Sequence, residues 1–240
     1  MPPDFRGKVA LVTGVGRVGQ IGHAVARGLG RAGARLVIAA VNAGTLAERA
    51  RELQAEGCDV RPSAGDLATP DAARRAVALA REQFGGLDVA VNVAGGLLNY
   101  GSALELTPER LDRELAVNVK TTFFVCQAAI PALRERGGGA IVNFASVTVL
   151  KPQTQMASYS AAKAAVAGLT RALAREFRDA RVRVNAVAPG VVRTSDNVAQ
   201  MKDAKLRWVE LDDVVSAVLY LASDEASAVT GEILPLAGDV

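Results

Sequence analysis

Short runs of consecutive apolar residues alternate along this chain with segments of helical length. The runs are rich in Val, Ile and Ala, and they cover residues 8–13, 35–41, 87–93, 140–145 and 181–188. Helical patterns cover residues 22–32, 45–56, 70–84, 108–136, 157–177 and 211–222. Strands that are apolar at consecutive positions suit a parallel sheet that is covered on both faces. The alternation therefore predicts an α/β fold over residues 1–240, with one doubly wound parallel sheet and helices on both faces in a single domain.

The composition fits one soluble domain and narrows the classes of function. Half of the 240 residues are hydrophobic and 22% are charged, which excludes a disordered or fibrous chain. No apolar run reaches the ~18 residues of a membrane span, and the N-terminal run is too short for a signal peptide. The net charge is +3, the basic residues are scattered along the chain, and aromatic residues are few. This pattern does not indicate a nucleic-acid-binding surface. We therefore expect a cytoplasmic protein with no membrane and no nucleic acid as partner.

Two cysteines and one histidine limit the chemistry further. Cys58 and Cys126 show no motif spacing, so we expect two buried thiols. His23 follows a glycine-rich loop and is expected on the surface of the first helix. A His-rich metal site and Ser-His-Asp catalysis are therefore not expected, and no metal is predicted.

The first apolar run leads directly into a glycine-rich loop, Thr13-Gly14-Val15-Gly16-Arg17-Val18-Gly19-Gln20-Ile21-Gly22. Its glycines spell G-x-G-x-x-G between a strand and a helix, which is the place of a dinucleotide-binding loop in a Rossmann-type fold. Glycines let the backbone approach a pyrophosphate, and the helix N-terminus offers free N–H groups. A plain strand-to-helix turn is the alternative interpretation. The loop residues that we predict to bind the cofactor are Gly14, Gly16, Arg17, Gln20 and Ile21.

No acidic residue stands where one commonly binds the adenosine ribose. The second strand run ends in Ala39-Ala40-Val41-Asn42, and neither Asp nor Glu occurs between His23 and Ala47. Without a carboxylate there, a 2′-phosphate is not repelled, and Arg17 can pair with it. We therefore predict that NADP(H) is favoured over NAD(H). The alternative is dual specificity, with Asn42 hydrogen-bonded to the ribose.

Tyr159 and Lys163 are four residues apart and so lie on one face of a predicted helix. An ammonium close to a phenol favours the phenolate and lowers the phenol pKa, so that it can exchange a proton near neutral pH. Ser146 directly follows a strand run, at the edge where open α/β sheets bind ligands. A Tyr-x-x-x-Lys pair alone carries little information, because helices contain it by chance.

Taken together and in order, the motifs resemble those of the short-chain dehydrogenase/reductase family over almost the whole chain. They are Thr13-Gly14, Asp66, Asn92-Val93-Ala94-Gly95, Asn118 in Val-Asn-Val, Ser146, Tyr159 with Lys163, and Pro189-Gly190 with Thr194. The interval of 13 residues from Ser146 to Tyr159 also matches the family. Within the family, the chain is most similar to the 3-oxoacyl-[acyl-carrier-protein] reductase subgroup.

The resemblance implies a role for each matching residue. Tyr159 would be the general acid/base, and Ser146 would hydrogen-bond the substrate oxygen. Lys163 would bind the nicotinamide ribose and lower the pKa of Tyr159, while Asn118 would hold a water in a proton relay. The other residues implied to line the cofactor are Asp66, Leu67, Asn92, Ala94, Gly95, Pro189, Gly190, Val192 and Thr194. The family also implies a homotetramer built through the two long helices, 108–136 and 157–177.

The chain departs from the family pattern in three places. The interval from Gly14 to Gly22 is two residues longer than usual, a length that resembles the enoyl-reductase branch. The upstream tyrosine of that branch is missing, since the matching position is Pro152. Val93 replaces the second Asn of Asn-Asn-Ala-Gly, and the segment between Thr194 and Trp208 is short and polar.

We predict an NADP-preferring oxidoreductase that interconverts a ketone and a secondary alcohol. Its substrate is expected to be a largely apolar small molecule. The residues expected to line its pocket are Gly96, Leu97, Leu98, Val147, Met156 and Val191. The alternatives are an enoyl (C=C) reductase on the same fold and a non-catalytic dinucleotide-binding regulator.

Overall fold

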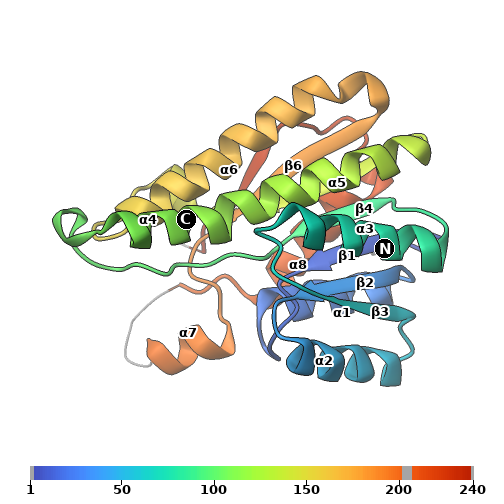
Figure 1. Cartoon of the computed structure of the whole chain (residues 1–240), viewed down its shortest axis with the longest axis horizontal. Coiled ribbons are helices and arrows are strands. Elements are labelled where there is room, and N and C mark those ends of the chain that lie inside the picture. Colours follow the sequence, from blue (N-terminus) through green and yellow to red (C-terminus); the bar gives the residue numbers. More distant parts are fainter. Residues whose placement is uncertain (1–2, 202–206, 239–240) are drawn as a thin grey trace.

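Seven parallel strands form one sheet in the computed structural model, which describes residues 3–201 and 207–238 (Figure 1). The strands are β1 (Val9–Thr13), β2 (Arg35–Ala40), β3 (Val60–Ala64), β4 (Val89–Asn92), β5 (Gly139–Phe144), β6 (Val182–Pro189) and β7 (Ile233–Leu236). Their order in the sheet is β3-β2-β1-β4-β5-β6-β7, and every neighbouring pair is parallel. The order reverses between β1 and β4, which is where doubly wound sheets open a crevice for ligands.

Helices cover both faces of this sheet, as the sequence predicts. The helices α1 (Ile21–Arg31), α2 (Ala43–Ala55) and α8 (Leu211–Ala222) share one apolar cluster with the sheet. On the other face lie α3 (Pro70–Phe84), α5 (Thr121–Glu135) and α6 (Ala157–Glu176). Two shorter helices, α4 (Pro108–Leu115) and α7 (Ser195–Gln200), lie at the edge where the strands end (Figure 1). The doubly wound Rossmann-type prediction is confirmed.

Strand β1 shows why its residues are apolar at consecutive positions. Val9 and Leu11 belong to the cluster under α3 and α5, whereas Ala10 and Val12 belong to the cluster under α1 and α8. All four are completely buried. Successive side chains of a strand point to opposite faces, so a strand that is covered twice needs an apolar residue at every position.

The apolar runs of the sequence do not predict two of the strands, β3 and β7. Strand β3 contains Arg61, Pro62 and Ser63, and β7 contains Pro235. Both strands lie at the edges of the sheet, where one side of the strand has no neighbour and Pro and polar residues are tolerated. Edge position therefore removes the apolar signal on which the prediction depends.

Other expectations about the fold have mixed outcomes. The predicted helix 108–136 is divided, because the π-helical turn Ala116–Lys120 separates α4 from α5. Cys58 and Cys126 are free and buried, as predicted. The surface position predicted for His23 is wrong: the side chain is 3% exposed and its Nε2 faces Glu52 of α2 at 3.7 Å. Residues 202–206 of the short segment after Thr194 lie outside the described residues.

The helical segment Pro108–Glu135 is long and apolar enough to cross a membrane by length and composition. Core helices of soluble proteins also pass that test, and 44% of the relevant window is buried inside this protein. Within residues 3–201 and 207–238, no group of three or more His, Cys, Asp or Glu side chains is arranged to hold a metal ion.

Candidate active site

The ends of β1 and β4 are joined directly at the point where the strand order reverses. The Thr13 hydroxyl donates to the carbonyl of Val91 at 3.4 Å and accepts from the amide of Ala94 at 3.0 Å. Gly14 has φ +74°, and a Cβ on it would lie 2.9 Å from the Ala94 nitrogen. Only glycine fits this close approach, which brings the loop after β1 against the loop after β4.

The glycine-rich loop leaves the N-terminus of α1 uncapped. Gln20 stands at the N-cap position, yet its side chain makes no capping hydrogen bond. A Cβ on Gly22 would lie 2.3 Å from the Gly14 carbonyl oxygen, so the helix begins tight against the end of β1. An uncapped helix N-terminus behind a glycine cradle is suited to a diphosphate. The residues present therefore fit a dinucleotide cofactor.

Lys163 lies on α6 with its ammonium buried at the end of β5. The side chain is 4% exposed, and Nζ donates to the carbonyl of Phe144 at 2.9 Å. Burial lowers the Lys163 pKa to about 8, and the charge of Glu114 acts in the opposite direction. Nζ lies 5.7 Å from the ring centroid of Tyr159, one helical turn earlier. At neutral pH the ammonium therefore stays protonated beside the phenol ring.

The pKa of Tyr159 differs in direction from the sequence-based expectation. Burial raises it above its ordinary value, a hydrogen bond with Ser146 lowers it, and the charge of Glu114 raises it. The expectation of a Tyr159 pKa below its ordinary value is therefore wrong, and Lys163 is not among the causes of the shift. The physical reason is that removal of the phenol from water outweighs the stabilisation of a phenolate by its neighbours.

Ser146 lies directly after β5, two residues beyond the carbonyl that binds Lys163. Its side chain is 6% exposed and accepts the amide of Thr148 at 3.3 Å, at the start of a short 3₁₀ turn (Val147–Val149). This turn fixes the hydroxyl on the side of Tyr159, with which it hydrogen-bonds.

Asn118 lies within the π-helical turn between α4 and α5. Its Oδ1 accepts the amide of Gly96 at 3.0 Å, and its Nδ2 donates to the Gly96 carbonyl at 2.9 Å. A Cβ on Gly95 would lie 2.7 Å from Asn118 Oδ1 and 3.5 Å from Lys163 Nζ. Single π turns in helices are frequent at functional sites. Here the turn directs an amide side chain at the loop after β4, within reach of the buried lysine.

Glu114 is a member of this cluster that the sequence did not single out. It has no exposed surface, and its carboxylate accepts hydrogen bonds from the backbone of Leu98 and Asn99 and from the Asn118 side chain. The only signal in the sequence is its position four residues before Asn118, on the same helix face. A single Glu in a polar helical segment carries no such meaning by itself.

The residues predicted to lie on the adenosine side of the cofactor differ from one another in their exposure. Asp66 is exposed, with Oδ1 accepting the amide of Ala68 at 2.9 Å, whereas Leu67 is buried in the core. Asn42 is exposed at the end of β2 and caps α2, accepting the amide of Thr45 at 3.0 Å. These residues and the partly exposed Ala94 follow the ends of β2, β3 and β4.

Asn92 corrects the sequence-based assignment. Its side chain is 2% exposed and donates to Asn143 Oδ1 at 2.9 Å and to Cys126 Sγ at 3.3 Å. The amide therefore links β4, β5 and α5 inside the molecule, and a ribose has no access to it. The prediction that Asn92 lines the cofactor is wrong for its side chain, because the first polar position after an apolar run is still inside the sheet.

The loop after β6 turns back toward the glycine-rich loop. Pro189 ends β6, and Gly190 donates its amide to Leu236 on β7. Val192 is buried in the core, and Thr194 caps α7 by accepting the amide of Asn197 at 3.2 Å. Any contact of Val192 with a cofactor would therefore go through its backbone.

Four contacts attach the glycine-rich loop to the start of α7. Gln20 Nε2 donates to Ser195 Oγ at 2.9 Å, and that hydroxyl donates to the Val18 carbonyl at 3.3 Å. The Ser195 amide donates to the Gly19 carbonyl at 3.1 Å. Arg17 forms an ion pair with Asp196. Arg17 therefore has Asp196 as its protein partner.

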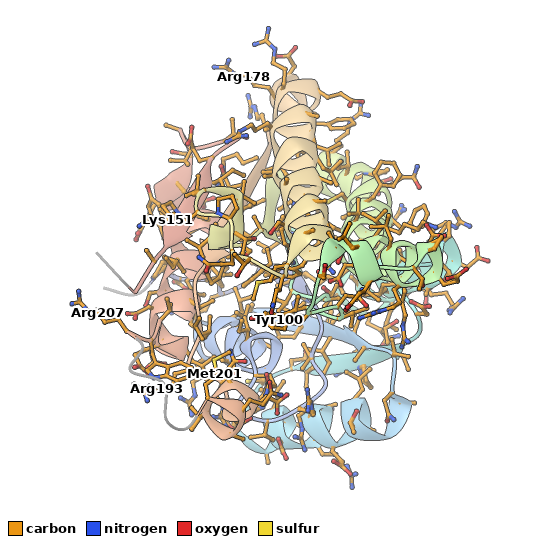
Figure 2. The ribbon with its side chains drawn as sticks, turned by 90° about the vertical axis from the view of Figure 1, so that its left-hand side faces the viewer. Tyr100, Lys151, Arg178, Arg193, Met201 and Arg207 are labelled. Atoms are coloured by element: carbon orange, nitrogen blue, oxygen red, sulfur yellow. The ribbon has the colours of Figure 1, made fainter. Side chains whose placement is uncertain are left out.

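Exposed apolar side chains gather at the same edge of the molecule. The large apolar side chains that are exposed in loops after strand ends and on α7 are Val18, Val41, Leu97, Leu98, Tyr100, Leu104, Leu150, Val198 and Met201. Figure 2 looks onto this edge and labels Tyr100 and Met201 on it. Elsewhere in the described residues only Phe123 and Tyr220 are exposed to this degree. Grouped exposed apolar residues mark a binding surface more often than scattered ones do.

A parallel sheet with a glycine cradle at its reversal point and a buried Lys–Tyr pair beside it defines a dinucleotide-dependent oxidoreductase class. Comparison with known proteins agrees. Residues 8–205 match the family model described as short chain dehydrogenase. The chain belongs to the short-chain dehydrogenase/reductase family, whose members are oxidoreductases that act on CH–OH and C=O groups.

Individual relatives match over nearly their full length. Cyclohexanol dehydrogenase of Acinetobacter sp. (strain SE19) is 35% identical over 238 residues, which are 96% of this chain and 94% of that protein. A 3-oxoacyl (acyl-carrier-protein) reductase from Agrobacterium tumefaciens C58, solved with NADP bound, superposes with a TM-score of 0.88 at 34% identity and covers 99% of this chain and 95% of its own. L-sorbose reductase from Gluconobacter frateurii, complexed with NADPH and L-sorbose, gives 0.91 at 29% identity, with 99% and 98% covered.

Proposed function

We propose that this protein interconverts a ketone and a secondary alcohol, with Tyr159 as the general acid/base and with NADP(H) preferred. The observation that carries the proposal is the meeting of Tyr159, Lys163, Ser146 and Asn118 at the carboxyl edge, beside the glycine cradle. A non-catalytic binding protein has no use for a buried ammonium beside a phenol, because both groups are costly to bury.

The four side chains divide the proton chemistry between them. A nicotinamide dinucleotide held by the glycine-rich loop and the N-terminus of α1 would supply or accept the hydride. Ser146 donates a hydrogen bond to the substrate oxygen, and the Tyr159 hydroxyl gives its proton to that oxygen during reduction. The Lys163 ammonium, protonated below its pKa of about 8, stabilises the phenolate that remains. Asn118 holds the loop at Gly96 and helps to return the proton from solvent.

The direction of the Tyr159 pKa favours the reductive half of this chemistry. Burial raises the pKa, so that the side chain is a neutral phenol at pH 7. A neutral phenol is the form that donates a proton to a developing alkoxide. We therefore propose that ketone reduction works at neutral pH and that alcohol oxidation needs alkaline pH.

Cofactor choice is proposed from the charges near the end of β2. Ala40 ends that strand, and Val41 and Asn42 after it carry no carboxylate that would repel a 2′-phosphate. Arg17 must leave Asp196 to reach the phosphate, and exposed ion pairs of this kind are worth about 0.2–1 kcal/mol. A charge-assisted hydrogen bond is worth about 1.5–3 kcal/mol, so a net preference of roughly tenfold for NADP(H) remains.

The apolar edge supports a largely apolar substrate. Leu97 and Leu98 are 41% and 44% exposed on the loop that leads from Gly95. Val147, Met156 and Val191 are partly exposed nearby in the chain segments around Ser146, Tyr159 and Pro189. Such side chains gain by covering an apolar ketone.

We also propose that copies of the chain associate as a homotetramer through α5 and α6. A groove of about 380 Å³ runs between these helices and is lined mainly by apolar side chains, among them Phe123, Ile130 and Phe177. Phe123 is 40% exposed in the single chain. Exposed apolar helix faces of this kind are suited to pairing with a second copy.

The proposal is tested by replacing the phenol alone. We expect Tyr159→Phe to bind NADPH normally and to reduce a panel of ketones roughly 10²–10⁴-fold more slowly than wild type. Tyr220→Phe, which changes an exposed tyrosine on α8 outside the apolar edge, is the matched control and should keep the wild-type rate. A Tyr159→Phe variant that keeps most of its activity contradicts the mechanism. Turnover of conjugated C=C substrates but not of ketones would instead favour an enoyl reductase.

A further inference from the structure

Among the described residues, Glu114 is the only acidic side chain that is buried, and it has no exposed surface at all. A carboxylate in such a position is costly unless hydrogen bonds or an opposite charge compensate for the lost water. The contacts of the carboxylate show what it does there.

The carboxylate of Glu114 accepts hydrogen bonds from three separate segments. From the loop after β4, the Leu98 amide donates to Oε1 at 3.2 Å, and the Asn99 amide and Nδ2 donate to Oε2 at 2.9 and 2.8 Å. From the π-helical turn, Asn118 Nδ2 donates to Oε1 at 3.3 Å. From the start of α6, the Ser158 hydroxyl donates to Oε2 at 3.5 Å.

Each of these segments carries part of the proposed active site. The loop after β4 carries Gly95, Gly96 and the apolar Leu97 and Leu98. The π-helical turn carries Asn118, whose Nδ2 also donates to the Glu114 carbonyl at 3.0 Å. Ser158 is the residue directly before Tyr159. One side chain therefore connects the elements whose relative position decides whether the proton can be transferred.

The charge of Glu114 also acts on both titratable groups of α6 that face it. It raises the Lys163 pKa against the effect of burial, and it raises the Tyr159 pKa. Arg110 on α4 does not bind the carboxylate; its Nε donates to Asn99 Oδ1 at 2.9 Å instead. The loop after β4 contributes only amides to the contact, and the π-helical turn contributes only Asn118. Lys163 is the buried cation whose pKa the Glu114 charge raises, and in the described part of the chain no direct ion pair joins the two side chains.

We propose that Glu114 is a positioning residue of the active site, which ties Asn118, the 98–99 backbone and the start of α6 together and serves as the buried counter-charge of Lys163. This inference rests on the proposed function for its catalytic consequence. The effect of the Glu114 charge on Tyr159 and Lys163, by contrast, can be measured in the protein alone, without turnover.

The test compares Glu114→Gln with Glu114→Asp. Glutamine keeps the shape but removes the charge, whereas aspartate keeps the charge at a shorter reach. Asp112→Asn, which neutralises an exposed carboxylate on the same helix, is the matched control. The first readout is the ultraviolet titration of tyrosinate in the protein without cofactor, with Tyr159→Phe used to assign the signal. The second readout is the pH profile of kcat and kcat/KM for alcohol oxidation and ketone reduction.

We expect Glu114→Gln to move the Tyr159 titration and the ascending limb of the oxidation profile to lower pH, by about half a pH unit or more. Loss of a nearby negative charge makes every proton in the cluster easier to remove. We also expect kcat for ketone reduction at pH 7 to fall about tenfold, because Asn118 and the loop lose a shared partner. Asp112→Asn should change neither quantity, and Glu114→Asp should keep the wild-type titration.

A Glu114→Gln protein with a lower melting temperature but an unchanged titration has lost only a structural contact, and this result overturns the proposal. If Glu114→Gln is insoluble, Glu114→Asp carries the test: a shifted titration or an unchanged kcat refutes the positioning role. An active Tyr159→Phe variant, by contrast, refutes the proposed function and leaves the titration result standing. The two failures are therefore distinguishable.

Discussion

The buried ammonium of Lys163 makes the stability of this protein depend on pH in an unusual direction. Burial lowers the Lys163 pKa from 10.5 to about 8 in the folded state, while the unfolded chain keeps the ordinary value. Between these two pH values the unfolded state holds one more proton than the folded state. Stability then rises with pH, by about 1.4 kcal/mol per unit, because the folded protein no longer has to bury a charge. From pH 8 to 9.5 the gain is about 2 kcal/mol.

The perturbation that isolates this effect is Lys163→Met, which removes the ammonium and keeps most of the side-chain volume. Urea unfolding of wild type and variant between pH 7 and 9.5 gives the free energy of unfolding of each. We expect the wild type to gain about 2 kcal/mol relative to the variant between pH 8 and 9.5, and nothing between pH 6 and 7. Lys151→Met, at an exposed position, serves as control. A difference between wild type and Lys163→Met that stays constant up to pH 9.5 would falsify the account of Lys163 as a buried cation.

Two further predictions concern the cofactor and the assembly. We expect Asp196→Asn to raise the preference for NADPH over NADH, measured as the ratio of their kcat/KM values, about two- to fivefold, because the substitution releases Arg17. We expect Ala40→Asp to reverse that preference. A wild type that favours NADH contradicts the cofactor assignment. We expect light scattering to give a tetramer for wild type and a smaller species for Phe123→Glu, because the substitution places a charge in the apolar groove. A wild-type monomer at micromolar concentration would disprove association through α5 and α6.

The sequence predicts the centre of this fold better than its margins. Strands β1, β2, β4, β5 and β6 are covered on both faces, so their apolar runs are unmistakable. The edge strands β3 and β7 contain Pro, and no run identifies them. The burial of His23 is not predicted because a polar residue in the first turn of an amphipathic helix gives no sign of which neighbours it meets. In the folded chain it lies beside Glu52, 29 positions further along.

In the candidate active site, too, the sequence predicts some features and not others. Ser146, Tyr159 and Lys163 could be predicted, because the site places them at fixed intervals at the end of one strand and on the next helix. The π-helical turn at Asn118 and the burial of Glu114 could not, since both depend on the loop after β4 folding back onto α4. The direction of the Tyr159 pKa also escaped prediction, because helical spacing gives proximity to Lys163 but says nothing of how much water the fold removes.

Two of the three departures of this chain from its family pattern meet in one set of contacts. The glycine-rich loop is two residues longer than usual, and the segment after Thr194 is unusually short and polar. The structure joins them: Gly19 and Gln20 reach Ser195, and Arg17 reaches Asp196. The longer loop thus provides hydrogen-bond partners for the start of α7. A ligand that drew Arg17 away from Asp196 would remove one of the contacts between the loop and α7.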